Sequence, residues 1–355
     1  MDFWKNLCYN TLREEGNTVT KRKTELSVMN LVMCMLVIFV HIASWSITVM
    51  DRSTLQYLCL LVPWRLSAFV VQGFLFLSGV KLFASDKPFH YGKFLLGRVQ
   101  KILVPYLLWV GIYYAYFIAI GWYTFSWRDL AEYICLGTLC SHFYYVIVAM
   151  QFYLLLPLWK WGLRRLPWWL AVGASLVITV LCKRYLHFPY DDRVFVGYLC
   201  YFVAGAAVGM HYEKVCAILK KLWWISAAAF VGFGFFDALL TYRSHLHGAV
   251  YPWFEALHIG YCFSAIAFLF TVSLWLFEGR KLPRVVALVD RSTYGIYLSH
   301  ILWIYVANNE LYRLGVSDLL YAFVLRGAFT YLVTIALCAL YTFGKEKLFH
   351  ARKNP

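Results

Sequence analysis

The chain has 355 residues, of which 62% are hydrophobic and only 14% are charged. A soluble domain of this length needs more charged residues to cover its surface. The composition therefore excludes a soluble enzyme. It predicts an all-helical protein that crosses a membrane several times, because helices satisfy their own backbone hydrogen bonds in lipid.

The apolar segments predict a helix bundle with about ten transmembrane helices in a single domain. In chain order they are residues 26–50, 66–83, 102–121, 143–159, 168–182, 194–210, 222–242, 254–277, 293–311 and 319–343. We expect residues 1–25 to form a basic cytoplasmic tail that carries a short interfacial helix. Residues 26–343 then form the transmembrane domain, and residues 344–355 form a second cytoplasmic tail.

The net charge of +15 has a topological explanation. On a ten-helix path with both termini inside, most of the 33 Lys and Arg residues lie on the cytoplasmic side, as the positive-inside rule requires. We therefore expect membrane lipids as partners, and the positive charge requires no nucleic-acid partner. The ten Cys residues form no paired C-x-x-C motifs, so we expect neither a metal site nor a disulfide framework.

His41 is the main candidate for chemistry. It lies in the apolar segment NLVMCMLVIFVHIAS, where an ionisable side chain is costly unless it has a partner or a function. An imidazole is the usual general base near neutral pH, so His41 could remove a proton from the hydroxyl of an acceptor. The alternative is that it forms hydrogen bonds between helices.

Other polar residues at membrane depth are candidates for binding the substrate. On the expected topology, His142, Asp237, Glu255 and His258 lie with His41 toward the outer half of the membrane. Such a group could bind a polar acceptor or could hold helices together. The full set of substrate-binding candidates is Asn30, His142, Glu255, His258 and His300.

Arg98 and Lys101 lie in GRVQKILVPY, where the chain enters the third helix from the cytoplasm. They could be positive-inside anchors, or they could form a phosphate site, since a guanidinium binds phosphate oxygens by paired hydrogen bonds. Both readings stay open. The chain has no Walker loop, no G-x-S-x-G motif and no H-E-x-x-H motif, so an ATPase, a triad hydrolase or a zinc protease finds no support.

Five segments in chain order form a more specific pattern. They are VIFVH ending at His41, FLFLSGVKLF at 74–83, LLGRVQKILVPYLLW at 95–109, SHFYYVIVAMQFYLLLP at 141–157 and STYGIYLSHILW at 292–303. Together they resemble the acyltransferase-3 family of bacterial membrane O-acyltransferases. The resemblance implies about ten helices, a catalytic role for His41, a role for Arg98 in binding the acyl-CoA donor, and a match between His300 and the late histidine of the family.

Asn30 departs from this pattern, because the family usually has an arginine eleven positions before the first-helix histidine. An asparagine forms hydrogen bonds but carries no charge, so a donor phosphate would need Arg98, Lys101 or another cation. Segments 144–160 and 197–214 are also similar to the staphylococcal poly-N-acetylglucosamine subgroup, whose members act on a surface polymer.

The resemblance therefore implies an integral O-acyltransferase of the bacterial plasma membrane. It would move an acetyl, succinyl or similar group from cytoplasmic acyl-CoA to a hydroxyl of a surface polysaccharide or glycolipid. No permanently bound cofactor is expected. Direct transfer and a covalent relay through Ser44 or Ser46 both stay open, as does the oligomeric state. The main alternative is a transporter, flippase or exporter of a lipid-linked sugar or polysaccharide. A sensor or scaffold without catalysis is the third.

Overall fold

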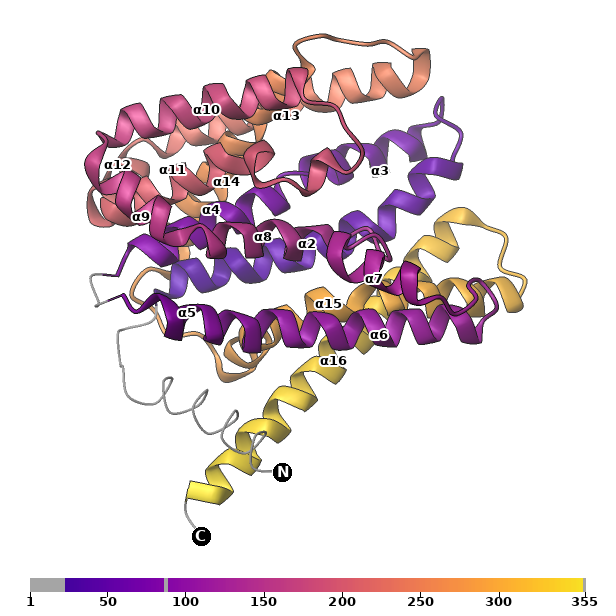
Figure 1. Cartoon of the computed structure of the whole chain (residues 1–355). Helices are drawn as coiled ribbons and strands as arrows, with labels where there is room; N and C mark the ends of the chain where they lie inside the picture. The colour runs from indigo at the N-terminus through magenta and orange to yellow at the C-terminus, as the bar shows by residue number, and fades with distance from the viewer. Residues whose placement is uncertain (1–22, 86–88, 354–355) are drawn as a thin grey trace.

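The computed structural model describes residues 23–85 and 89–353, and this part of the chain is helical and contains no strand. The interfacial helix expected within residues 1–25 lies outside it, apart from the last three of those residues. Each of the ten predicted apolar segments is helical over most of its length (Figure 1). The all-helical fold predicted from the sequence is thus confirmed.

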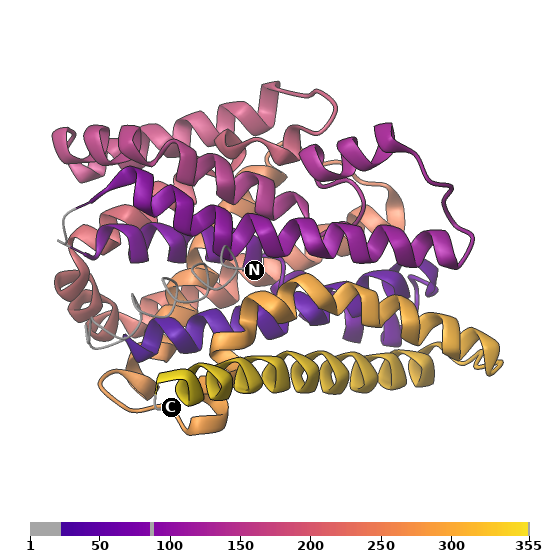
Figure 2. The ribbon, with the colours of Figure 1, turned by 60° about the horizontal axis from the view of Figure 1, so that its bottom comes forward.

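Most of the helices lie roughly alongside one another in one bundle (Figure 1). They are α2 (Thr24–Val49), α3 (Leu55–Leu66), α4 (Val70–Phe83), α5 (Tyr91–Arg98), α6 (Val104–Ala119), α8 (Tyr144–Leu154), α9 (Leu156–Arg165), α10 (Trp168–Tyr185), α11 (Leu199–Met210), α13 (Trp223–His247), α14 (Phe254–Phe277), α15 (Arg284–Arg313) and α16 (Leu319–Lys353). The other α-helices of the described residues are α7 (Trp127–Leu136) and α12 (Tyr212–Lys221). Figure 2 shows α15 and α16 side by side along one edge of the bundle.

Six helical stretches of the described chain are long and apolar enough to cross a membrane, or up to eight if each of two bent pairs is one span. The bent pairs are α8 with α9, at 59°, and residues 195–210 with α12, at 101°. Helices α10 and α15 run with the others in Figure 1 and would bring the count to ten. The number of spans and the orientation of the termini stay predictions.

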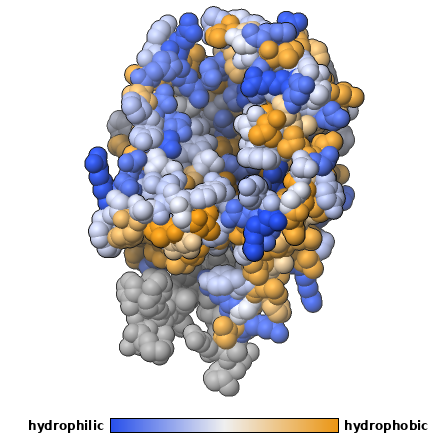
Figure 3. Space-filling view, turned by 90° about the vertical axis from the view of Figure 1, so that its right-hand side faces the viewer, coloured by the Kyte–Doolittle hydropathy of each residue, from blue (hydrophilic) through white to orange (hydrophobic). Residues whose placement is uncertain are grey.

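Two ends of the bundle are named for the description of the site. The basic end is where α2 begins and where α5, α9 and α12 lie, at the left of Figure 1. The far end is the opposite one, where α2 ends. Figure 3 views the far end, where hydrophilic residues gather around a recess.

Helices α4 and α11 pack closely because two glycines of α11 lie against the backbone of α4. A Cβ atom on Gly205 would lie 2.8 Å from the carbonyl carbon of Phe76, and one on Gly209 would lie 2.6 Å from the carbonyl oxygen of Val80. Gly205 and Gly209 are four residues apart, the spacing that lets membrane helices approach closely. This contact matters for the site, because the adjoining face of α4 lines a cavity.

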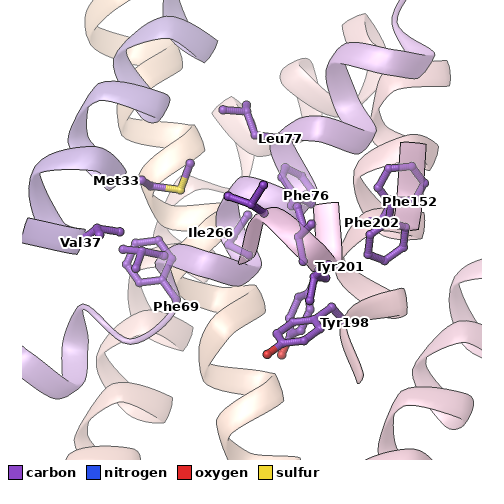
Figure 4. Close-up of a cluster of buried hydrophobic side chains, with 14 of the residues drawn as sticks. Met33, Val37, Phe69, Phe76, Leu77, Phe152, Tyr198, Tyr201, Phe202 and Ile266 are labelled. Atoms are coloured by element: carbon purple, nitrogen blue, oxygen red, sulfur yellow. The ribbon is translucent and has the colours of Figure 1, made fainter. Parts of the chain in front are cut away.

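Buried apolar side chains join α4 and α11 to their neighbours (Figure 4). Phe152 of α8 stacks on Phe202 of α11, with ring centroids 4.4 Å apart. Met33 of α2, Phe76 of α4 and Ile266 of α14 belong to the same cluster. This packing fixes α2, α4 and α8, the helices that surround the polar residues described next.

Candidate active site

Three histidines from distant parts of the sequence meet inside the bundle. His41 lies on α2, His142 on the turn before α8, and His300 on α15. The ring centroid of His300 is 5.2 Å from that of His41 and 5.0 Å from that of His142, and the centroids of His41 and His142 are 6.2 Å apart. His142 and His300 are buried, whereas His41 is partly exposed. We call these three residues the histidine cluster.

The hydroxyl of Tyr113 on α6 shapes α15 beside His300. It donates to the carbonyl of Leu298 at 3.0 Å and accepts from the backbone N–H of Leu302 at 2.7 Å. A side chain that bridges a carbonyl and the N–H four residues later inserts into the helical ladder. The carbonyl of Leu298 also lies 3.3 Å from Nε2 of His142. Tyr113 and His142 thus share one acceptor on the helix that carries His300.

The turn that carries His142 depends on Gly137, which ends α7. Gly137 has φ +65°, and a Cβ atom there would lie 2.9 Å from the carbonyl carbon of Phe143. Only glycine adopts this backbone without strain or a clash. The turn is fixed at its other side by the hydroxyl of Tyr297, which donates to the carbonyl of His142. It leaves Ser141 exposed, with Oγ 3.4 Å from Nδ1 of His41.

The hydrogen bonds of the two buried histidines define their neutral tautomers. A carbonyl oxygen only accepts, so Nε2 of His142 carries the proton that it donates to Leu298, and Nδ1 of His300 carries the proton that it donates to Tyr297, at 2.7 Å. The remaining ring nitrogens, Nδ1 of His142 and Nε2 of His300, are buried and have no hydrogen-bond partner among the described residues. Each presents a free lone pair, so the cluster favours a ligand that brings hydroxyl groups.

A cavity of about 320 Å³ lies between α2, α4, α5, α8 and α15, toward the basic end. Three of the predicted site residues, Asn30, Arg98 and Lys101, line it together with Lys81. The described lining contains no carboxylate. Its other members are Phe74, Leu77, Ser78, Leu82, Ile102, Tyr145, Val146, Ala149, Tyr153 and Tyr294. We call this space the basic cavity.

The local backbone places Arg98 and Lys101 at the basic cavity. Pro105 has no N–H to offer the carbonyl of Lys101, and the helix widens into a π-helical segment at Val99–Leu103. The guanidinium carbon of Arg98 lies 4.9 Å from the ring centroid of Phe94 and 5.0 Å from that of Tyr153. Aromatic contacts hold a guanidinium in place without using its hydrogen-bond donors, so those donors stay available to a ligand.

Asn30 is held against α15 at the wall of the basic cavity. Its Nδ2 donates to Oγ1 of Thr293 at 3.0 Å. The amide therefore supplies a hydrogen bond between helices and leaves the positive charge of the cavity to Lys81, Arg98 and Lys101.

Tyr297 lies between the basic cavity and the histidine cluster along α15, three residues from Tyr294 and three from His300. Its ring centroid is 5.6 Å from that of Tyr145 and 6.4 Å from that of Tyr294, both of which line the cavity. On its other side it is 5.4 Å from His142 and 6.0 Å from His300. One buried tyrosine thus contacts both the cavity wall and the two buried histidines.

His258 and Glu255 lie at different positions from the histidine cluster. Nδ1 of His258 lies 3.0 Å from Oδ1 of Asp237 and 2.8 Å from Nη2 of Arg65, while Nε of Arg65 donates to Asp237 at 2.5 Å. Glu255 lines a second cavity, of about 330 Å³, and its carboxylate is 3.8 Å from Nζ of Lys183. The structure therefore brings His41, His142 and His300 together and puts His258 and Glu255 elsewhere.

Two arginines and one serine were missed from the sequence as site candidates. The sequence analysis singles out neither Arg65 nor Arg326, but Arg65 pairs with buried Asp237, and Arg326 is 1% exposed inside the bundle. Arg326 donates to the carbonyl of Ile42, the residue after His41, at 3.2 Å. The position of Arg326 within an apolar segment could have identified it as a site candidate. Nothing in the sequence distinguished Ser141.

The chain belongs to the acyltransferase-3 family, whose model is described as an acyltransferase domain and matches residues 24–343. The membership of this family that the resemblance predicted is therefore confirmed. It is also similar to a curated protein described as "Probable poly-beta-1,6-N-acetyl-D-glucosamine export protein" from Staphylococcus aureus (strain MRSA252), with 24% identity over 218 residues. The match covers 57% of this chain and 61% of that relative. No solved structure matches the chain.

Proposed function

We propose that this acyltransferase moves an acetyl, succinyl or similar acyl group from cytoplasmic acyl-CoA to a hydroxyl of an envelope polysaccharide or glycolipid. The observation that carries the proposal is the arrangement of two polar sites on either side of Tyr297. One is a cation-lined cavity toward the basic end, and the other is a cluster of three histidines deeper in the bundle.

The basic cavity suits an anionic donor. Lys81, Arg98 and Lys101 line it, and its described lining contains no carboxylate. Phosphate oxygens of a nucleotide are bound well by a guanidinium, which offers two parallel donors. The volume of about 320 Å³ is at the small end of ligand cavities, so we expect the phosphates to stay near the mouth while the pantetheine arm enters.

The histidine cluster suits removal of a proton from a hydroxyl. His41 is the partly exposed member, so it is the one that an acceptor reaches first. It takes the proton of a hydroxyl whose oxygen attacks the carbonyl of the acyl group, and it returns that proton to the leaving group. His142 and His300 each offer a free lone pair nearby, which would hold neighbouring hydroxyls of a sugar in place.

The polysaccharide acceptor is proposed from the printed description of the staphylococcal relative, which names a polymer of N-acetylglucosamine. The hydrophilic recess at the far end supports it, because a polar glycan could approach there (Figure 3). On the predicted topology this end faces outward, and the basic end faces the cytoplasm. The description of that relative also names export, so polysaccharide export is the second candidate function.

Transfer of labelled acyl groups separates the two functions. Membranes that contain the wild type are incubated with radiolabelled acetyl-CoA or succinyl-CoA, and the label in envelope glycans is counted. The same is done with His41→Gln and, as a matched control, with exposed His187→Gln, at equal protein levels. We expect label with the wild type and the control and a loss of about 100-fold or more with His41→Gln. Polymer export that persists without any labelling from either donor would favour the exporter.

A further inference from the structure

We propose that Ser141 carries the acyl group as a covalent ester between donor and acceptor, with His41 as its base. This inference rests on the proposed function, since it requires an acyl donor and a hydroxyl acceptor. It assigns the histidine cluster a nucleophile, and it replaces the relay through Ser44 or Ser46 that the sequence left open.

The geometry of Ser141 and His41 is that of a nucleophile and its base. Oγ of Ser141 is 3.4 Å from Nδ1 of His41. A serine hydroxyl is a weak nucleophile until an adjacent base takes its proton, and such pairs are often slightly long before a substrate binds. The two residues are 100 positions apart in the sequence and are brought together by the turn that begins at Gly137.

Ser44 and Ser46 have other partners. The hydroxyl of Ser44 donates to the carbonyl of Val40 at 2.6 Å and accepts from Nε1 of Trp64 at 3.0 Å. The hydroxyl of Ser46 accepts from Arg326 at 2.7 Å. These bonds fit the role of polar residues that join membrane helices. Ser141, in contrast, faces His41.

The turn also places Ser141 at the boundary between the exposed surface and the buried histidines. Ser141 is exposed, while the next residue, His142, is buried against Tyr297 and His300. An acyl group on Ser141 would thus have left the basic cavity and would lie where a large glycan can reach it. A covalent carrier would let donor and acceptor bind at different times, so that the two never need to occupy the bundle together.

Both half-reactions balance without a further reactant. In the first, His41 takes the proton of Ser141, Oγ attacks the thioester carbonyl, the C–S bond breaks, and the thiolate leaves as CoA thiol with that proton. In the second, His41 takes the proton of the acceptor hydroxyl, whose oxygen attacks the ester. The bond between Oγ and the acyl carbon then breaks, and Ser141 regains the proton from His41.

The test is to find the acyl group on the protein. Full-length protein is incubated with radiolabelled acetyl-CoA in the absence of glycan, quenched in acid, digested and analysed by mass spectrometry. We expect the added acyl mass on the peptide that contains Ser141, and its release by hydroxylamine. Ser141→Ala should lose both this label and glycan transfer, the latter by about 100-fold or more. Ser44→Ala, the matched control, should keep both.

Three outcomes would overturn the proposal in different ways. Glycan transfer at the wild-type rate by Ser141→Ala would show direct transfer, and the acyltransferase function would stand. Wild-type transfer without acyl mass at position 141 in the quenched protein would also show direct transfer. This measurement uses the wild type alone, so it does not depend on the folding of a variant. Absence of transfer by the wild type from either donor would remove the proposed function, and the ester on Ser141 with it.

Discussion

Replacement of Tyr297 by Phe should slow transfer without weakening donor binding. The substitution keeps the ring between the basic cavity and the histidine cluster but removes the hydroxyl that donates to the carbonyl of His142. That bond fixes the turn on which Ser141 and His142 lie. Donor binding should be unchanged, because Tyr297 is not among the residues that line the basic cavity.

The size of the effect follows from one lost hydrogen bond. A neutral hydrogen bond of this kind contributes about 0.5–1.5 kcal/mol. Since 1.4 kcal/mol corresponds to a factor of ten, kcat should fall by about 2- to 13-fold if the whole loss is expressed in the orientation of the turn.

Tyr294→Phe is the matched control, because Tyr294 lies one turn earlier on α15 and stacks on Tyr297. Its hydroxyl donates to the carbonyl of Ile102 at 2.8 Å, and both residues line the basic cavity. This variant should raise the KM for acyl-CoA and leave kcat near the wild-type value. Both constants are measured by release of CoA thiol at saturating glycan. An unchanged kcat in Tyr297→Phe, or the same kinetic change in both variants, would refute the reasoning.

Three further predictions concern the donor site and the packing of the bundle. Arg98→Lys keeps the charge but loses the planar contacts with two rings. The KM for acyl-CoA should therefore rise by roughly fivefold, equivalent to about 1 kcal/mol. An unchanged KM would exclude a role for Arg98 in binding the donor. Asp237→Asn leaves Arg65 without its carboxylate partner and should cost about 3–5 kcal/mol of stability. The loss is measured as a lower melting temperature in detergent. Equal melting temperatures of variant and wild type would contradict the ion pair of Arg65 and Asp237. Gly205→Ala should cost about 1–3 kcal/mol of stability in the same assay. Gly173→Ala should not, because a Cβ atom added there would meet no neighbouring atom of the described residues within 4 Å. Equal losses of stability would contradict the close packing of α4 and α11.

The helices could be predicted from the sequence, because each apolar segment can be recognised without knowledge of its neighbours. It also marked His41, since an ionisable residue in an apolar segment is conspicuous wherever it packs. It could not place His258 correctly relative to His41. Both lie toward the same half of the membrane on the expected topology, but depth along a helix does not say which neighbours a side chain faces.

Contacts between distant segments were beyond sequence reasoning for the same reason. Ser141 and His41 are 100 positions apart, and Arg326 reaches the carbonyl of Ile42 across 284 positions. Neither pair has a spacing that a helical period could indicate. Nothing in the sequence marks Gly137, whose left-handed backbone allows the turn before α8. The structure shows why a glycine is required there, because Phe143 leaves no room for a Cβ atom.

Helix α15 links the donor site to the chemistry in a single element. Tyr294 lines the basic cavity, Tyr297 contacts both Tyr294 and His300, and His300 belongs to the histidine cluster; the three follow one another at intervals of three residues. At 1.5 Å per residue, the six residues from Tyr294 to His300 span about 9 Å along the helix. The pantetheine arm therefore needs to pass only about two turns of α15 to bring its thioester to His41. Each of the three side chains should control a different constant: Tyr294 the KM for the donor, Tyr297 kcat through the turn that carries Ser141, and His300 the KM for the acceptor.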